Sequence, residues 1–214
     1  MLKFKIKTKL INRENFLSSI CRNKTILHLG ATASPKTREC IESNNLLHSK
    51  LTNVAKKCVG LDIDKKAIQI AKNYGINNIY FCDIEKTIPV EKNSFSIIVA
   101  GEIFEHLKNP GLALEQIMKI SSQKTRLIIS VPNSNSIKNV IRALLGYEII
   151  HPDHLLHHSH HTLKALLLQH NFRVDYYFSY VNNNKKIPTK IFNLLFKLFP
   201  QLSEGLGAVC SLRN

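Results

Sequence analysis

The chain has 214 residues, 44% of them hydrophobic and 21% charged, a composition that is typical of one globular domain and excludes a disordered chain. Thirty basic against fifteen acidic residues give a formal net charge of +15, which indicates an anionic partner such as nucleic acid, a membrane surface or a phosphorylated substrate. Only seven of the thirty are arginine and the lysines are spread along the chain, which disfavours a specific nucleic-acid site.

Residues 1–23 read as a basic, helical lead-in, and residues 24–214 as one domain. The start, MLKFKIKTKL, alternates lysine with apolar residues and lacks the continuous apolar core of a signal peptide. No run of eighteen apolar residues occurs, so we expect no membrane span. The five cysteines are scattered without a C-x-x-C pair, which is typical of free thiols in a reducing compartment. Together these features favour a cytoplasmic protein.

Strands and helices are predicted to alternate from residue 24 onward. Five short, continuous apolar runs predict parallel strands that are covered on both faces: 24–31, 54–64, 76–85, 94–101 and 124–133. Helices are predicted from Asp64 as an N-cap to Gly75, over 109–120, and over 162–171. Late strands follow at 172–181 and 207–213. This alternation predicts a doubly wound α/β sheet.

In such a sheet, ligands bind beyond the carboxyl ends of the strands. Gly30 ends the first strand and would let the backbone approach a ligand closely, and Ser34-Pro35 would start the next helix. Asp62 ends the second strand and could accept hydrogen bonds from ribose hydroxyls, while Asp83 could accept one from an adenine amino group. One Asp after a strand is usually a cap or turn former, so the information lies in the order of these groups.

From Lys24 to the C-terminus the sequence resembles the class I S-adenosylmethionine-dependent methyltransferases. Within them it is most similar to the small-molecule branch that includes quinone-precursor and surface-glycan methyltransferases. The stretches that carry the resemblance are ILHLGA, VGLDIDKKAIQIA, FCDIE, FSIIVAGEIFEHLKNPG, RLIISVPNSNS and DHLLHHSHHTLKALLLQHNFRV.

The resemblance implies a Rossmann-like, doubly wound, mostly parallel seven-stranded sheet with an antiparallel last strand. It implies S-adenosylmethionine as cofactor, S-adenosylhomocysteine as product, and no metal. It also implies a set of cofactor-binding residues at the strand ends: Gly30, Ala31, Thr32, Asp62, Ile63, Asp83, Ile84, Ala100 and Gly101.

The glycine motif departs from the family pattern. The family reads Asp-x-Gly-x-Gly-x-Gly, whereas residues 28–34 read HLGATAS, so only Gly30 is kept and His28 replaces the leading acid. Added Cβ atoms would crowd the cofactor, which favours a weakened site and a non-catalytic relative. The intact Asp62 and Asp83 favour tolerated drift with cofactor binding retained, and this is the interpretation we prefer.

Methyl transfer from a sulfonium needs alignment above all, and a hydroxyl acceptor also benefits from a general base. The resemblance implies that this base comes from the region after the fourth strand or from the late histidine segment. The candidates are His106, His154 and His158, with Glu105 to orient or polarise the base. A structural histidine that bridges loops is the alternative for His106.

The late segment, HPDHLLHHSHHTL at 151–163, contains six of the ten histidines. On a helix, four of its positions would be spaced for zinc: His151, His154, His157 or His158, and His161. Asp153 is the only acid nearby, so we favour plain architecture at the pocket mouth, leading into a helix capped by Ser159 or Thr162.

An amphipathic insert occupies about residues 185–204. A helical wheel places its apolar residues on one face: Ile191, Leu194, Leu195, Leu198 and Phe199. This helix could pack on the domain, act as a lid, or rest on anionic lipid.

The leading hypothesis is an S-adenosylmethionine-dependent O-methyltransferase acting on a small molecule or a saccharide. A lipid-linked saccharide, with peripheral contact to an anionic membrane, would reconcile the insert with the positive charge. The alternatives are an RNA methyltransferase and a non-catalytic protein of the same fold.

Overall fold

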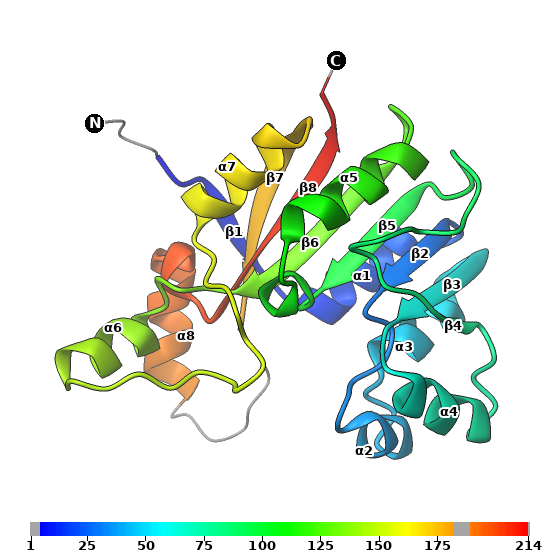
Figure 1. Cartoon of the computed structure of the whole chain (residues 1–214). Coiled ribbons are helices and arrows are strands. Elements are labelled where there is room, and N and C mark those ends of the chain that lie inside the picture. Colours follow the sequence, from blue (N-terminus) through cyan, green and yellow to red (C-terminus); the bar gives the residue numbers. More distant parts are fainter. Residues whose placement is uncertain (1–4, 182–188, 214) are drawn as a thin grey trace.

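The computed structural model describes residues 5–181 and 189–213, with the backbone alone for 189–193 (Figure 1). Its centre is an eight-stranded sheet in the order β1-β7-β8-β6-β5-β2-β3-β4. The strands are β1 (Thr8–Ile11), β2 (Thr25–Leu29), β3 (Lys57–Asp62), β4 (Ile79–Phe81), β5 (Ile97–Gly101), β6 (Arg126–Pro132), β7 (Phe172–Tyr180) and β8 (Gly205–Leu212). All neighbouring strands pair in parallel except β8, which is antiparallel to both β6 and β7. The predicted α/β sheet with an antiparallel last strand is therefore confirmed.

Helices cover both faces of the sheet (Figure 1). They are α1 (Arg13–Cys21), α2 (Thr37–Glu42), α3 (Leu47–Val54), α4 (Lys65–Asn73), α5 (Pro110–Ile120), α6 (Ile137–Leu144), α7 (His160–Gln169) and α8 (Thr189–Leu198), with single 3-10 turns at η1 (Phe104–His106) and η2 (Pro200–Leu202).

Successive residues of the central strands point to opposite faces and so supply two cores. Leu27 of β2 packs in the core under α5 and α7, whereas its neighbour Ile26 packs in the core under α1 and α3. A strand between two helix layers needs apolar residues at every position, which is why these runs do not alternate. Each fully buried aliphatic side chain of this kind contributes about 1.5–3 kcal/mol.

The lead-in differs from its prediction, because it is not only helical. β1 pairs in parallel with β7 and adds an eighth strand to the expected seven. The helix that follows, α1, is capped by Asn12, whose side chain accepts from the Asn15 amide at 3.0 Å, and it buries Leu17 and Cys21 in the core. The Lys/apolar alternation at the start of the chain was the signal for this edge strand, since lysine is common on exposed edges.

The helix starts are set by local capping. Asp64 caps α4 as predicted, accepting from the amides of Lys66 and Ala67. Ser159 caps α7 in a capping box: its hydroxyl oxygen accepts from the Thr162 amide, and the Thr162 hydroxyl oxygen accepts from the Ser159 amide. The predicted helix start at Ser34-Pro35 was wrong: the Ser34 hydroxyl donates to Asp64 instead, and α2 begins at Thr37.

All five cysteines are free, as expected, and four of them are buried. Burial raises the pKa of Cys21 to about 12 and the pKa values of Cys58 and Cys82 to about 11, so these thiols stay protonated and unreactive. Among the described residues, no helix has the length and apolar character needed to cross a bilayer.

Candidate cofactor and acceptor site

A cleft of about 930 Å³ opens where the carboxyl ends of β2, β3 and β5 meet. Its size lies within the range of small-molecule and cofactor sites. All the predicted cofactor residues except Ala100 line it: Gly30, Ala31, Thr32, Asp62, Ile63, Asp83, Ile84 and Gly101. Ala100 is completely buried in the core that packs against α5. The strand order thus gathers residues that lie far apart in the sequence.

Gly30 makes the bend at the floor of the cleft. Its φ is +68°, and its amide and that of Ala31 both donate to the Leu61 carbonyl, at 2.9 and 3.1 Å. A Cβ at this position would lie 2.8 Å from Cδ1 of Ile103. The one glycine kept from the family motif is therefore the one whose conformation and surroundings exclude a side chain.

Thr32 stands where the motif has a later glycine, and its side chain has a definite role. Its amide and its hydroxyl both donate to Oδ2 of Asp62, each at 2.8 Å, while the Asp64 amide donates to Oδ1 at 2.9 Å. A carboxylate can accept about four hydrogen bonds, so Asp62 keeps one accepting position. The Thr32 oxygen adds lone pairs of its own. This set fits the two hydroxyls of a ribose.

The far wall of the cleft suits a flat base. Ile63 is an apolar side chain that is 62% exposed toward the cleft, beside the buried Ile84. Asp83 accepts from the Glu85 amide at 3.1 Å and lies 3.3 Å from Lys86, an exposed ion pair of little energetic weight. An adenine ring would cover Ile63 and place its amino group near Asp83. The residues present therefore fit S-adenosylmethionine at both its ribose and its adenine.

His28, which replaces the motif's leading acid, forms a buried pair with His48 of α3. The two rings stack at 5.5 Å, and their Nδ1 atoms lie 3.3 Å apart, so one ring donates to the other. Burial first, and then the neighbouring His48, hold the pKa of His28 well below its usual range. Both imidazoles are therefore neutral, whereas the acid of the family motif would carry a negative charge at this position.

Glu102 lines the cleft and contacts two residues that the sequence did not point to, Arg13 and the buried Tyr180. Glu102, at a φ of +54°, accepts a 2.8 Å hydrogen bond from the Tyr180 hydroxyl and lies 3.7 Å from Arg13. The Arg13 guanidinium lies over the Tyr180 ring at 5.2 Å. A Cβ on Gly101 would lie 2.6 Å from this guanidinium, so Gly101 makes room for it. Arg13 comes from the lead-in and Tyr180 from β7, and neither stands in a recognisable motif.

Glu105, His106 and His154 converge beside the cleft. Each offers a ligand atom, and the three atoms lie within 4.8 Å of one another. Neither oxygen of the buried Glu105 carboxyl is hydrogen bonded within the described residues, and burial raises its pKa to about 8. Among the described groups, this trio has the ligand types and spacing that could hold a divalent cation.

The two histidines of the trio have different environments. Nδ1 of His106 lies 3.1 Å from the Asp153 carbonyl, so Nδ1 carries the proton and Nε2 keeps its lone pair. The His106 and His154 rings meet edge to face at 4.7 Å. Burial, then His106 and His151, lower the pKa of His154, which keeps this imidazole neutral.

The other histidines of the segment lie outside this trio. Residues 151–158 are not helical, so the zinc arrangement that a helix would allow is not formed. The acid of the observed cluster is Glu105, not Asp153. His158 is buried and does not line the cleft; its carbonyl accepts from the Ser134 amide at 2.9 Å, tying the segment to the end of β6. His106 lines the cleft itself, and His154 lies in an adjoining pocket.

Residues 41–177 match the family model of a methyltransferase domain, which is more than half of the chain. The chain belongs to this methyltransferase domain family. The match begins beyond the altered glycine motif at residues 28–34, so that motif contributes nothing to it. This S-adenosylmethionine-dependent methyltransferase matches no curated protein in sequence.

Solved structures share the fold of this methyltransferase at low sequence identity. One is a methyltransferase from Thermotoga maritima described as a possible histamine N-methyltransferase, with a TM-score of 0.64, 10% identity, and coverage of 94% of this chain and 87% of that one. The YcgJ protein from Bacillus subtilis gives 0.60 at 12% identity, covering 94% and 98%. A methyltransferase from Aquifex aeolicus gives 0.59 at 15% identity, covering 93% and 88%.

Proposed function

We propose that this methyltransferase moves the methyl group of S-adenosylmethionine to a hydroxyl oxygen of a small molecule or a saccharide, including a lipid-linked one. The observation that carries the proposal is the Glu105–His106–His154 trio, of which His106 lines the cofactor cleft and His154 a neighbouring pocket. A hydroxyl acceptor must lose a proton as it attacks, and a neutral imidazole is the side chain best tuned to take it near neutral pH.

The cofactor, when bound, supplies a methyl group on a sulfonium sulfur that leaves as a neutral thioether. Asp62 and Thr32 would hold its ribose, and Ile63 and Asp83 its adenine. An acceptor hydroxyl would lose its proton to an imidazole nitrogen of this chain as its oxygen takes the methyl group. Alignment of the two reactants can supply about 7–11 kcal/mol of the barrier.

Two imidazoles are placed to take that proton. Nε2 of His106 has its lone pair free for the cleft because the Asp153 carbonyl holds the proton on Nδ1. His154 is neutral because its pKa is lowered. Glu105 offers a ligand atom within 4.8 Å of those of both histidines, and its carboxyl, whose pKa burial raises to about 8, can orient an imidazole through a hydrogen bond. A positioned general base of this kind contributes about 10²–10⁴-fold to the rate.

Calorimetry with S-adenosylmethionine and S-adenosylhomocysteine tests the cofactor half of the proposal. Wild type should bind both, and Asp62→Ala should bind about tenfold or more weakly, because a hydrogen bond to a charged group contributes about 1.5–3 kcal/mol. Unchanged affinity in Asp62→Ala would rule out the assigned ribose contact. The absence of heat and of any thermal shift at saturating cofactor would contradict the enzyme itself.

Transfer of a labelled methyl group tests the acceptor half. A panel of hydroxylated small molecules, saccharides and tRNA identifies the acceptor class, and incorporation only into tRNA would overturn the proposal. With the acceptor found, His154→Ala and His106→Ala should lower kcat by about 10²–10⁴-fold if each acts as base. His161→Ala, an exposed histidine of the same segment, is the matched control. Full activity in both base variants would remove the imidazoles from the mechanism.

A further inference from the structure

α6 and the loop that follows it expose an unusual amount of apolar side chain. α6 buries none of its residues, and Figure 1 shows it projecting away from the sheet. We call the following residues, each 42–82% exposed, the apolar surface: Val140, Ile141, Leu144, Leu145, Tyr147, Ile149 and Ile150. A continuous exposed apolar patch marks an interaction site more often than chance exposure.

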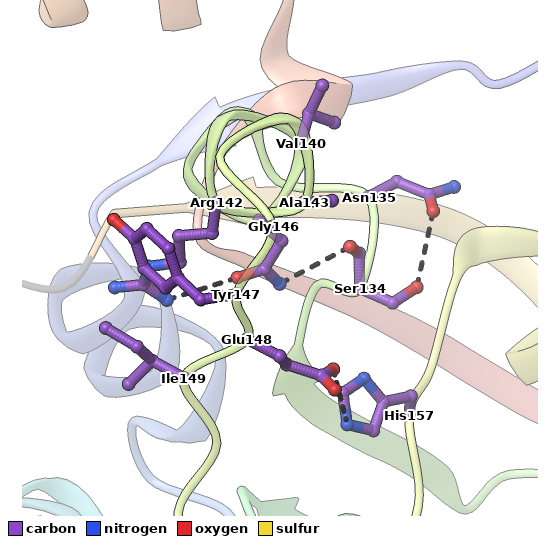
Figure 2. A pocket seen from close by; sticks show the side chains of 11 residues that line it. Ser134, Asn135, Val140, Arg142, Ala143, Gly146, Tyr147, Glu148, Ile149 and His157 are labelled. Carbon is purple, nitrogen blue, oxygen red and sulfur yellow. Dashed lines mark hydrogen bonds and ion pairs between the residues drawn. The ribbon is translucent and has the colours of Figure 1, made fainter.

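Charged groups of both signs flank the apolar surface: Lys138 and Arg142 on α6, and in the following loop Glu148, which lies 3.8 Å from His157. α6 contains Lys138 and Arg142 and no acidic residue, within a chain whose net charge is +15. Lys138 pairs with Glu204, whereas Arg142 has no ion pair among the described residues and donates to the Asn139 side chain at 3.2 Å. Arg142 lines a pocket of about 550 Å³ between α6 and the loop, together with Ser134, Glu148 and His157, and Figure 2 shows Glu148 paired with His157. A cationic group behind an apolar rim fits an anionic headgroup.

α8 presents a second apolar face. The predicted face includes Leu194, Leu198 and Phe199, which are 60%, 65% and 46% exposed, and the residue that packs inward is Phe196 instead. The ion pair between Lys138 of α6 and Glu204, which follows η2, places both segments beyond the carboxyl end of β6. α8 also contains lysine and no acidic residue.

We propose that the apolar surface docks this protein onto an anionic lipid bilayer, with Leu144 and Leu145 at the acyl boundary and Arg142 at the headgroup phosphates. Helices with an apolar face and lysine or arginine beside it bind in this way, and the attraction to anionic lipid adds to the apolar burial. A second copy would bring an equal positive charge against the same face, and RNA would leave the leucines in water. Both fit less well.

Docking would also place the bilayer near the trio. The segment that follows the apolar surface returns to η1, where the amides of Leu155 and Leu156 donate to the Glu105 carbonyl at 2.8 and 3.1 Å. An acceptor anchored in lipid would therefore arrive beside His154, a point that rests on the proposed function. The docking itself does not depend on the acceptor and is measured without it.

Co-sedimentation with vesicles is the direct test. Wild type should sediment with phosphatidylglycerol–phosphatidylcholine vesicles, not with phosphatidylcholine alone, and high salt should release it. The variant Leu144→Ser/Leu145→Ser should partition about tenfold or more weakly, and Arg142→Gln should weaken binding less. Because α6 buries no side chain, both variants should fold and keep the cofactor affinity of wild type. No binding to anionic vesicles, or equal binding by the double variant, overturns the proposal.

A fluorescent probe gives an independent readout, because the chain has no tryptophan. Leu144→Trp should shift its emission to the blue when anionic vesicles are added. Tyr80→Trp on the edge strand β4, where Tyr80 is 55% exposed, is the matched control and should not shift. If ultracentrifugation instead finds a wild-type dimer that Leu144→Ser/Leu145→Ser converts to monomer, the occupant is a second copy and the lipid proposal fails.

Discussion

The residues that would hold the cofactor differ from the Glu105 carboxyl and from α6 in how far the chain itself provides their contacts. On the cofactor side, Asp62 accepts three hydrogen bonds from its own chain and Gly30 closes a turn against β3. Beside the cleft, Glu105 is buried without a hydrogen-bond partner among the described residues, and on α6 Leu144 is 82% exposed. The cofactor residues are held by hydrogen bonds within the chain, with one accepting position left on Asp62, whereas Glu105 and Leu144 are groups that an acceptor, a cation or a surface would satisfy.

Two leucines on helices, one buried and one exposed, should differ most in how much their loss lowers the free energy of unfolding. Leu114 of α5 is completely buried, so Leu114→Ala should lower the free energy of unfolding by about 2–5 kcal/mol. Leu144→Ala removes the same atoms from α6 and should change it by less than about 0.5 kcal/mol. Urea denaturation of both variants measures the difference. A large loss in Leu144→Ala would mean that α6 packs against part of the chain.

Glu105→Gln tests whether the buried carboxyl makes the stability of wild type depend on pH. The folded-state pKa of Glu105 is raised to about 8 from 4.5, so wild type loses stability as pH rises between these values, because only the unfolded chain ionises there. Glutamine does not titrate, so Glu105→Gln should match wild type near pH 5 and be more stable by more than about 1 kcal/mol at pH 8. Thermal melting at both pH values measures this. Parallel pH curves would mean that Glu105 titrates normally.

Adding a divalent cation to the same thermal-melting experiment provides a control. Bound to Glu105, His106 and His154, it would hold the carboxylate ionised and flatten the pH dependence of wild type. Glu105→Gln should show no such effect.

The smallest expected effect tests the altered glycine motif. Thr32→Val keeps the shape of the side chain but removes the hydroxyl that donates to Asp62, so the free energy of unfolding should fall by about 1 kcal/mol. Thr162→Val, which loses the capping-box hydrogen bond on α7, is a control remote from the cofactor. If only Thr32→Val also changes the affinity for S-adenosylmethionine, Thr32 belongs to the ribose site.

Local patterns were sufficient for most of the fold. Strands β2 to β8 were predicted within a few residues, because continuous apolar runs and helix caps such as Asp64 depend on neighbours in the chain. The order of motifs also predicted eight residues that line the cleft, since the carboxyl ends of parallel strands meet at one edge. Ala100 is the exception, because alternation along β5 turns its side chain into the core.

The acceptor side could not be predicted in the same way. Helical spacing within HPDHLLHHSHHTL offered a metal site only as the less favoured alternative, and the non-helical segment does not form that arrangement. The observed trio joins Glu105 and His106 with His154, which lies 49 and 48 positions further along the chain, through a loop with no periodic signal. Arg13 and Tyr180 reach Glu102 from the two ends of the domain, so no local pattern contains them.

The sequence by itself determined the α/β class and, through the family resemblance, the cofactor. It also predicted residues that line the cleft, because these depend on local periodicity and on motif order. Tertiary structure alone decided that the lead-in adds a strand, that Thr32 binds Asp62, and that Glu105 meets two histidines. It also decided that α6 exposes its apolar face, because the burial of a helix depends on what the rest of the chain places against it.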